Sequence, residues 1–404
     1  MVDNDLIQLA NASTPCIIKV IGVGGGGGNA VAQMYRDGIE NVSYLVANTD
    51  SKALEDNIVP AHLQLGPGLG AGGNPDKGRE LAEDDIEKIA SVYNDETEMV
   101  FITAGMGGGT GTGASPIFAR EARKKGILTI GIVTIPFLFE REVRIDKALD
   151  GLETLQKEVD AMLVINNQRL CDIYSDLSVL NAFKRADETL STAVKSITEI
   201  IYMHGRINLD FEDVNTTLRD GGVAVMSSGY AEGECRVTKA IEEALNSPLL
   251  NNNNVFDATH VLLSITMSDK GENALRTEEL NEVTEFMSAF NPDVHTKWGL
   301  AVDKSLANKI KITIVASGFG IYGKKTSKVI KDEKGEDPEL CNRRKRFYST
   351  YSSQQRYRRK PLVYIFSEDD LLNENVLQFV EDIPTLKRSK EYLEQIKGVS
   401  SHNQ

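Results

Sequence analysis

The sequence lacks the usual marks of secreted, metal-binding and membrane-spanning proteins. Its four cysteines are widely spaced and form no CxxC pair, so we expect reduced structural thiols. Its five histidines show no HExxH or other ligand spacing, so no dedicated metal site is predicted. No apolar run is long enough to span a bilayer, and the first residues lack the parts of a secretion signal. These absences favour a cytoplasmic protein that is not an integral membrane protein.

Charge is also unevenly spread along the chain. The formal net charge is −14, yet the segment 324–360 contains 13 Lys and Arg against 5 Asp and Glu. The remainder is strongly acidic and repels nucleic acid, so no specific nucleic-acid partner is expected. The basic segment is rich in Ser, Tyr and Gln and has no apolar pattern, which predicts a disordered linker. Its charge would allow contact with an anionic lipid surface or nucleic acid.

The rest of the chain has two regions of alternating strand and helix patterns. In the first half the apolar runs are nearly continuous, which is typical of a parallel sheet covered on both faces. A long amphipathic segment without Gly or Pro predicts a helix, and a second α/β pattern follows it. Strands are expected at 16–24, 42–50, 98–105, 127–137, 161–167, 222–233, 259–268, 295–303 and 309–320, and helices at 29–37, 75–92, 176–204, 236–246 and 278–290.

Five consecutive glycines follow the first expected strand, in IGVGGGGGNAV. Glycine lets the backbone approach an anion closely, and the helix that follows offers free N–H groups. Gly22, Gly24 and Gly27 also satisfy the GxGxxG dinucleotide pattern, and Asp50 ends the next strand. From this loop alone, a dinucleotide-dependent oxidoreductase therefore remains an alternative to a mononucleotide-binding protein.

A second glycine loop, AGMGGGTGTGASP, follows the strand at 98–105 and opens a helix. Its glycines would place several N–H groups around one anion, and Thr110 and Thr112 would add hydroxyl donors. The chain has no GxxxxGK[ST] pattern and therefore no P-loop. A third loop, GLGAGGNPDKG, also precedes a helix. Three such loops at the carboxyl ends of neighbouring strands would form one crevice.

Taken together, the motifs GVGGGGGNAV, NTD, GAGGNP, GMGGGTGTG and NLDFEDV resemble FtsZ, the tubulin-like GTPase family of bacterial cell division. The resemblance runs from about Ile17 to Gly320 and includes the tail. It implies a tubulin/FtsZ-like α/β fold in which a Rossmann-like parallel-sheet GTPase domain is joined by a long central helix to a second α/β domain. The implied parts are a flexible N-terminus (1–15), the GTP-binding domain (16–175), the central helix (176–205), the C-terminal domain with a catalytic acid loop (206–322), a disordered basic linker (323–366) and a tail with an adaptor-binding peptide (367–404).

The resemblance also implies a site for GTP or GDP, with Mg²⁺ bound mainly through the nucleotide. Phe183 and Asp187 share a helix face and would hold the guanine, although their spacing alone favours a core Phe beside a solvated Asp. Glu140 and Arg144 would hold the ribose and phosphate region, although their spacing also fits a surface ion pair. The implied nucleotide-binding residues are Gly25, Gly26, Gly27, Gly28, Asn29, Gly72, Gly73, Asn74, Gly107, Gly108, Gly109, Thr110, Gly111, Thr112, Glu140, Arg144, Asn166, Phe183 and Asp187.

The implied catalytic residues Asn208, Asp210 and Asp213 lie in NLDFEDV, just after the long helix. Two carboxylates three residues apart share a face if a helix starts there, and they can orient a water. The same pair would also serve as an N-cap and first-turn acid of a helix. In the family this loop enters the nucleotide pocket of the next subunit, so that each chain holds half a site.

The remaining expectations concern assembly and partners. The resemblance implies head-to-tail filaments that form the cytokinetic ring at midcell, on the inner face of the membrane. The peptide DIPTLKR, from Asp382 to Arg388, resembles the family's C-terminal peptide, which docks on membrane adaptors such as FtsA. Other division regulators would bind as well. Two alternatives stay open: the oxidoreductase, which the second glycine loop and Asp187 disfavour, and a filament protein that binds nucleotide without hydrolysing it.

Overall fold

The computed structural model describes residues 16–173, 178–247, 255–268, 275–319, 343–344 and 347–348. All the helices and strands named below belong to the first of the chain's two units, which ends at Phe347. The predicted linker beyond residue 319, apart from its four described residues, and the DIPTLKR peptide lie outside the described residues. In the part of the chain that is described, no helix is long and apolar enough to cross a membrane.

A single sheet of eleven strands runs through both halves, in the order β3-β2-β1-β4-β5-β6-β8-β11-β9-β10-β7. The first six strands are parallel, and their order 3-2-1-4-5-6 is that of a doubly wound nucleotide-binding fold. They are β1 (Ile18–Val23), β2 (Val42–Asn48), β3 (His62–Gln64), β4 (Met99–Gly105), β5 (Leu128–Ile135) and β6 (Ala161–Asn166).

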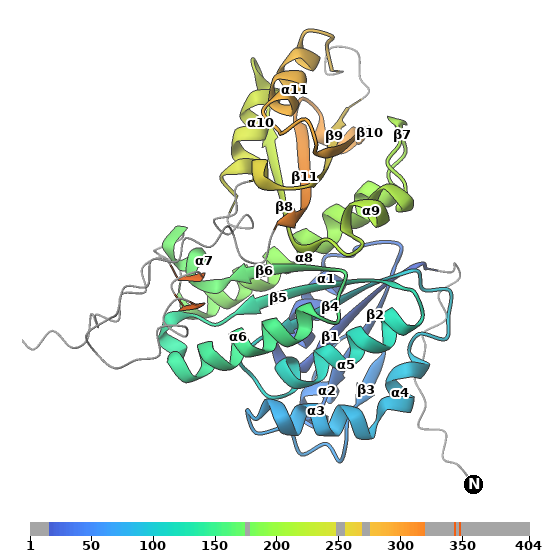
Figure 1. The fold of residues 1–404 in the computed structure, drawn as a ribbon, viewed down its shortest axis with the longest axis vertical. Helices are drawn as coiled ribbons and strands as arrows, with labels where there is room; N and C mark the ends of the chain where they lie inside the picture. Colours follow the sequence, from blue (N-terminus) through green and yellow to red (C-terminus); the bar gives the residue numbers. More distant parts are fainter. Residues whose placement is uncertain are drawn as a thin grey trace, which may run out of the picture. The chain divides into compact units, whose positions relative to one another are not determined.

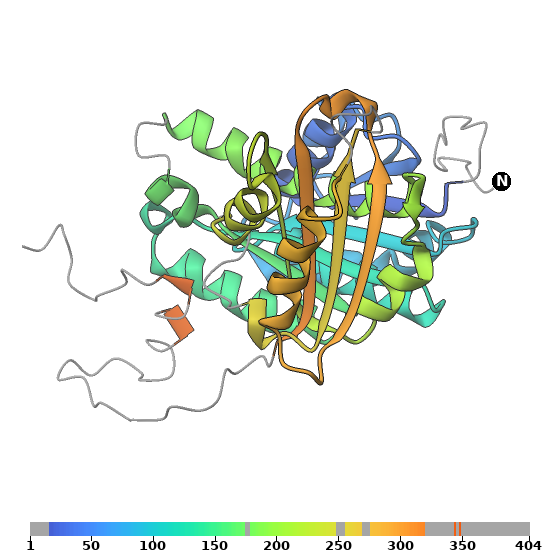
Figure 2. The ribbon, with the colours of Figure 1, turned by 90° about the horizontal axis from the view of Figure 1, so that it is seen from above.

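The second half of the sheet is mixed. β8 pairs with β6 in parallel at only two residues, and β11 lies antiparallel to both β8 and β9. α10 and α11 pack on one face of these strands, as both views of the fold show (Figures 1 and 2). The strands are β7 (Gly205–Ile207), β8 (Gly222–Ala231), β9 (His260–Met267), β10 (His295–Val302) and β11 (Ile310–Phe319), and the helices are α10 (Arg236–Leu245) and α11 (Glu279–Ser288).

The helices of the first half follow its strands in alternation, as apolar runs separated by helical patterns predict. The 24-residue helix α8 (Val179–Tyr202) packs on α1 and on the sheet, and its buried face belongs to a core that also includes residues of α9 and of the second half. The helices are α1 (Gly24–Arg36), α2 (Ser51–Glu55), α3 (Pro75–Asp84), α4 (Ile86–Ser91), α5 (Thr110–Lys124), α6 (Glu142–Gln156), α7 (Asn167–Ile173) and α9 (Phe211–Leu218), with a short 3-10 turn η1 (Leu138–Glu140).

Two helix predictions differ from the structure. The helix expected at 75–92 is divided at Asp85, whose carboxylate accepts a hydrogen bond from the Gly66 backbone N–H at 2.6 Å. That tertiary contact stabilises a break that the helical pattern does not reveal. The helix expected from Asn29 begins five residues earlier, because the glycines themselves form its first turn. The five-glycine run is therefore a helix N-terminus rather than a loop that precedes one.

Candidate functional site

The first two glycine loops pack against each other at the carboxyl ends of β1 and β4. A Cβ atom on Gly24, where φ is +75°, would lie 2.7 Å from the Gly111 nitrogen. A Cβ atom on Gly26 would lie 3.1 Å from the Gly105 Cα atom. Side chains at these positions would separate the loops, so glycine is required for the two backbones to meet. The first two loops are thus in direct backbone contact, as their places on the adjacent strands β1 and β4 allow.

The third loop reaches the same place from the sheet edge. Its strand, β3, is separated from β1 by β2, so the three loops do not follow three adjacent strands. The loop nevertheless packs on the second one, because a Cβ atom on Gly109 would lie 2.8 Å from the Cβ atom of Ala71. Asn74 then caps α3, accepting a hydrogen bond from the Asp76 N–H at 3.0 Å.

The helices that start at the first two loops have no side-chain cap. α1 begins after Val23 and α5 after Gly109, and neither residue offers a side-chain acceptor to the first turn. By contrast, Asp50 and Asn74 cap α2 and α3 through their side chains. Uncapped first-turn N–H groups, together with the helix dipole, favour an anion, and two such ends meet here.

The glycines of these loops have two different surroundings. At Gly25, Gly72 and Gly73 a Cβ atom would have no neighbouring atom within 4 Å, and at Gly108 its nearest neighbour would be at 3.9 Å. These four border open space that a ligand can fill. The other predicted glycines are required for close packing instead: Cβ atoms on Gly27, Gly28, Gly107, Gly109 and Gly111 would lie 2.3 to 3.1 Å from Thr103, Val46, Arg144, Ala71 and Gly105, respectively.

The two loop threonines hold the protein together rather than facing open space. Thr110 Oγ1 lies 2.6 Å from Thr49 Oγ1, which ties the second loop to the end of β2. Thr112 Oγ1 accepts a hydrogen bond from the Gly107 N–H at 2.8 Å. Both side chains are buried. Each hydroxyl therefore has a protein partner that helps to fix the shape of the loop. Because Thr112 Oγ1 only accepts in this bond, its O–H group keeps its donor, and the expected ligand role of both threonines stays a prediction.

A cavity of about 300 Å³ lies between α1 and α8, beside the first glycine loop. Phe183 and Asp187 both line it, as their shared helix face predicts, and Asn29 lines it from α1. The Phe183 ring is 41% exposed and packs edge-on against Phe137, with 4.9 Å between the ring centroids. This leaves ring surface available for a flat ligand. Arg36 and Lys184 also line the cavity, and sequence reasoning had not selected them.

Asp187 is an unusual carboxyl. Its partial burial raises its pKa to about 7, although Arg36 opposes the shift and Glu188 adds to it. A carboxyl whose pKa lies near neutrality, in a cavity, is typical of a functional group. When ionised it can accept two hydrogen bonds from neighbouring N–H donors of a ligand, as guanine supplies.

Glu140, Arg144 and Asn166 lie where η1, α6 and β6 end or begin. Glu140 Oε2 is 3.1 Å from an Arg144 guanidinium nitrogen, and Glu140 Oε1 accepts a hydrogen bond from the Phe137 N–H at 2.9 Å. Asn166 is buried, and its Oδ1 accepts from the Gln168 N–H. Its Nδ2 donates to the carbonyl of Phe347. Both polar atoms of the Asn166 side chain thus have partners within the protein.

The predicted acids form the start of α9. Asp210 accepts a hydrogen bond from the Asp213 N–H at 3.0 Å, and Asp213 accepts one from the Asp210 N–H at 3.2 Å, which makes a reciprocal capping box. Asn208 Oδ1 accepts from the Gly205 N–H at 2.8 Å. The two carboxylates therefore share a helix face, as expected if the helix starts there.

Lys297 on β10 is a partner of these acids that sequence reasoning missed. Its Nζ lies 2.7 Å from Asp213 Oδ1. Burial alone would raise the pKa of Asp213, but the Lys297 ammonium and the hydrogen bonds with Asp210 bring it below its ordinary value. Asp213 therefore stays ionised at neutral pH. The pair is 84 residues apart in sequence, so no local pattern could have indicated it.

The acids and the glycine loops lie at opposite ends of the strands of the parallel sheet. The glycine loops are at the carboxyl ends, and the acids are on the side of the amino ends. α8 carries Asp187 near its start and ends at Tyr202, which contacts the backbone of Ile17 at the amino end of β1. About 22 Å of helix separates Asp187 from Tyr202. α9 also lies at the amino ends, since Arg219 donates to the Gly126 carbonyl just before β5. In Figure 1, β6 runs toward α7 and away from α9.

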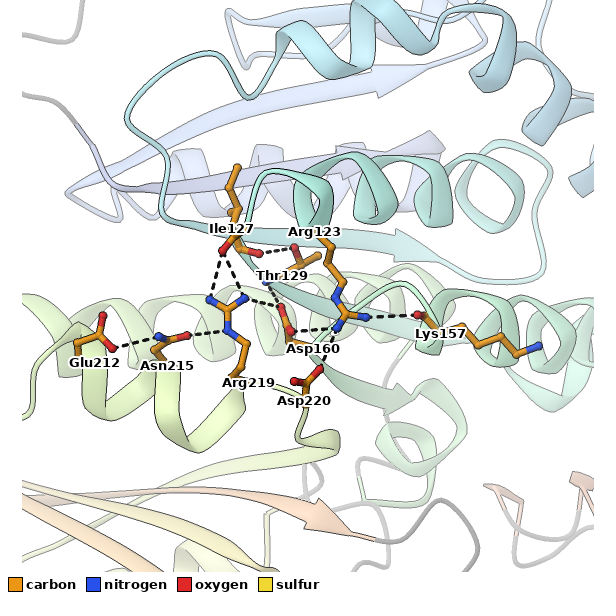
Figure 3. A network of polar contacts seen from close by, with 10 residues as sticks. Arg123, Ile127, Thr129, Lys157, Asp160, Glu212, Asn215, Arg219 and Asp220 are labelled. Atoms are coloured by element: carbon orange, nitrogen blue, oxygen red, sulfur yellow. Dashed lines mark hydrogen bonds and ion pairs between the residues drawn. The ribbon is translucent and has the colours of Figure 1, made fainter.

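A buried carboxylate anchors α9 at the amino ends of the strands (Figure 3). Asp160 is 1% exposed, and its Oδ2 accepts a hydrogen bond from the Thr129 N–H at 2.8 Å. Arg123, at the end of α5, and Arg219, just after α9, approach it from two sides as ion pairs of 3.5 Å. The Arg123 pair does not have hydrogen-bond geometry. α5, which starts at the second glycine loop, is thereby connected to the helix that carries the acids.

The described residues hold no cluster of three or more His, Cys, Asp or Glu side chains that could bind a metal ion. The binding of Mg²⁺ mainly through the nucleotide stays a prediction. Two uncapped helix ends and open glycines can accept an anion, and the described protein side chains there supply few hard ligands.

Comparison with known proteins places this geometry in a family. The chain matches the Tubulin/FtsZ family GTPase domain over residues 17–175, the FtsZ family C-terminal domain over 222–320, and the FtsZ C-terminal model over 358–403. The last match falls on residues outside those that the structure describes.

Individual proteins agree with these matches. The chain is 45% identical to the cell division protein FtsZ of Porphyromonas gingivalis over 408 residues, covering 96% of this chain and 89% of that protein. It is 42% identical to the protein of the same name from Azotobacter vinelandii, covering 79% of this chain and 82% of that one. A solved FtsZ dimer from M. jannaschii is 38% identical, with a TM-score of 0.68, covering 76% of this chain and 89% of that one.

Proposed function

The chain belongs to the FtsZ family of tubulin-like GTPases, and we propose that it is a cell-division protein that assembles head to tail into GTP-dependent filaments. In this proposal each chain supplies the nucleotide pocket of one interface and the acids of the next. Hydrolysis of GTP to GDP and phosphate then depends on assembly. The relatives that are named cell division proteins, and the solved dimer, support the assignment.

The pocket half of the site binds and orients the nucleotide. The uncapped N-termini of α1 and α5 hold the phosphates, beside the open positions at Gly25 and Gly108. Phe183 stacks on the base, and the Asp187 carboxylate accepts from the two guanine N–H donors, which adenine cannot both supply. Mg²⁺, held mainly through the phosphates, would neutralise charge on the oxygens of the transferred group.

The acid half completes the site from a neighbouring chain. Asp213 is ionised and fixed by Lys297 and Asp210, so that it can orient a water without reorganising. Phosphoryl transfer requires mainly positioning and electrostatic stabilisation, which a preformed pair of carboxylates supplies. Asn208, which shapes the turn before α9, helps to present them.

One observation carries this proposal: the acids and the pocket lie at opposite ends of the strands of the same sheet. A single chain cannot bring them together without taking its sheet apart. Repetition of one heterologous contact does so, and it generates a filament. The alternative of an oxidoreductase loses its basis, since the family is that of a GTPase.

Mixing two inactive variants tests the divided site. Asp213→Ala keeps the pocket and removes an acid, whereas Gly25→Leu keeps the acids and fills the open space between the phosphate-binding helices. Each variant alone should hydrolyse GTP very slowly. A mixture should regain activity at interfaces that join an intact pocket to intact acids, about a quarter of those formed at random. No regain in a mixture that still assembles would contradict the divided site and favour a filament that does not hydrolyse its nucleotide at this interface.

We also propose that the filament assembles at midcell on the inner face of the membrane. The peptide from Asp382 to Arg388 would bind a membrane adaptor such as FtsA, and other division regulators would bind the filament. The match of residues 358–403 to the FtsZ C-terminal model supports this role for the tail. Deletion of the peptide should abolish binding to the adaptor and leave GTP hydrolysis unchanged; co-sedimentation with adaptor-coated vesicles measures it.

A further inference from the structure

The basic segment of the chain has no part in the function proposed above, yet two of its arginines have defined partners in the structure. Arg343 and Arg344, here called the arginine pair, form ion pairs with residues of α6. Arg344 is only 7% exposed. An arginine is rarely buried to this extent unless its guanidinium is paired, so its partners decide what holds it.

The partners form a stripe of carboxylates on the outer face of α6. Its members are four, four and three residues apart, which places them on one side of the helix. A neighbouring side of the helix packs into the core through Ile145, Leu149 and Leu152. The stripe, here called the acidic stripe, consists of Glu142, Asp146, Asp150 and Glu153.

The arginine pair uses all four members of this stripe. Arg344 donates from Nε to Asp146 Oδ1 at 2.7 Å and from a terminal nitrogen to Oδ2 at 2.5 Å, a bidentate pair. Glu142 lies 3.5 Å from the same guanidinium. Arg343 lies 2.9 Å from both Asp150 and Glu153. Bidentate geometry and low exposure distinguish this contact from an ordinary surface ion pair.

The contact also reaches the candidate nucleotide site. The carbonyl of Phe347, three residues after Arg344, accepts a hydrogen bond from Asn166 Nδ2. The Asn166 amide has two N–H donors and two acceptor positions, and the bonds to Phe347 and Gln168 use one of each. A nucleotide that takes the donor now bonded to the Phe347 carbonyl therefore competes with that contact. α6 also carries Arg144, the partner of Glu140, which lies between Glu142 and Asp146 in the sequence.

We propose that the arginine pair and Phe347 form an intramolecular clamp on α6, and that nucleotide contact with Asn166 and docking of the clamp oppose each other. The occupant of the acidic stripe is thus this chain's own basic segment, whose positive charge complements the acidic body. Because binding effects are reciprocal, a clamp that weakens nucleotide binding is itself released by nucleotide. The second part rests on the proposed function, since it requires nucleotide at Asn166; the docking itself does not.

Arginine reactivity in the full-length protein tests the docking. Phenylglyoxal modification of Arg344, followed by mass spectrometry, is compared with that of the exposed Arg206 in the same sample. We expect Arg344 to react at least about fivefold more slowly than Arg206, and to match it in the variant Asp146→Asn/Asp150→Asn. The matched control Glu80→Gln/Asp84→Asn removes the same charge from exposed positions of α3 and should leave Arg344 protected.

Several outcomes would overturn the clamp. Equal reactivity of Arg344 in the wild type and the α6 variant would remove the docking, whatever the GTPase assays show. Protection that increases with protein concentration would assign the stripe to a neighbouring chain.

The affinity for fluorescent GDP tests the opposition between clamp and nucleotide. Arg343→Asp/Arg344→Asp should bind GDP about fivefold more tightly than wild type, because the clamp is lost. Adding Asp146→Arg/Asp150→Arg restores the attraction with the charges exchanged and should reverse this gain; GDP affinity is measured here because the variant has no arginine at 344 to modify. Unchanged GDP affinity in the first of these variants, with normal GTP hydrolysis, would refute the opposition while leaving the proposed function intact.

Discussion

The helix N-termini at the two ends of the parallel strands differ in how they are capped. At the carboxyl ends of the strands, α1 begins at Gly24 and α5 begins at Thr110, just after Gly109, and neither helix has a side-chain cap for its first-turn N–H groups. At the amino ends, α9 begins with a reciprocal capping box, and its acid is further paired with Lys297. The carboxyl ends of the strands thus keep backbone N–H donors available for an anion, whereas at the amino ends the carboxylates of α9 are held in place. The difference supports the proposal that the carboxyl ends of the strands receive a ligand and the amino ends present a reactive group.

Removal of an acid should have the largest effect. Asp213→Ala is expected to lower assembly-dependent GTP hydrolysis by about 1000-fold, the range found for a positioned general base, with GTP affinity unchanged. Phosphate release and nucleotide binding are measured separately. Glu212→Ala on the same helix is the control, because Glu212 contacts Asn215 and lies outside the capping box. Full activity of Asp213→Ala would show that the amino ends of the strands do not supply the reactive group.

Filling the open space at the carboxyl ends of the strands should come next. Gly25→Leu is expected to weaken GTP binding by about 100-fold, since the new side chain occupies the place of two charge-assisted hydrogen bonds. Its melting temperature should stay near that of the wild type, because no atom lies within 4 Å of the added Cβ position. Gly28→Leu, which would meet Val46, should instead lower stability. Tight GTP binding by Gly25→Leu would place the phosphates elsewhere.

Neutralising the buried anchor of α9 should have an intermediate effect. Asp160→Asn removes the buried carboxylate that Arg123 and Arg219 share and is expected to cost about 1–2 kcal/mol of unfolding free energy, with a melting temperature lower by about 2–4 °C. The expected loss is small because both arginine side chains are about a third exposed and can be hydrated. Asp220→Asn removes the exposed partner of Arg123 and should cost less than about 0.5 kcal/mol. Equal losses in the two variants would mean that burial of Asp160 confers no special role.

The smallest expected effect is a pH dependence of binding. The free protein holds Asp187 with a pKa of about 7, and only the ionised form accepts both guanine donors. Affinity for GDP should therefore be full above pH 7 and fall by up to about tenfold per pH unit below it. Because the phosphates of GDP titrate nearby, the informative quantity is the difference from Asp187→Asn, in which this component should be absent. Parallel pH profiles of wild type and variant would remove Asp187 from the base pocket.

Much of the fold was predictable because its signals are local. Apolar strands that alternate with helices indicated the parallel half, and the strands at 222–233, 259–268, 295–303 and 309–320 correspond to β8, β9, β10 and β11. The break at Asp85 was not predictable, since it depends on Gly66. The start of α1 within the glycine run was also missed, because glycine has a low helix propensity and only the packing on the second loop fixes it there.

The candidate site divides in the same way. The i and i+4 spacing of Phe183 and Asp187 predicted a shared helix face, and both residues line one cavity, whereas their place in a pocket was implied only by the family resemblance. The pair Asp210 and Asp213 begins a helix, as its sequence suggests. The hydroxyls of Thr110 and Thr112 also bond within the protein, which the sequence did not indicate, and their predicted contact with the ligand stays a prediction. No local pattern distinguishes a hydroxyl that faces a ligand from one that faces a strand end.

The sequence by itself determined which segments can hold an anion and which can present carboxylates, because glycine freedom, helix periodicity and capping depend on neighbours along the chain. Only the tertiary structure decided that Gly24 meets Gly111 and that the acids lie at the other ends of the strands. It also decided that Arg344 docks on Asp146, a contact that spans 198 positions of the sequence. Such pairings are set by how the sheet is ordered and covered, and this order is a property of the whole packed chain.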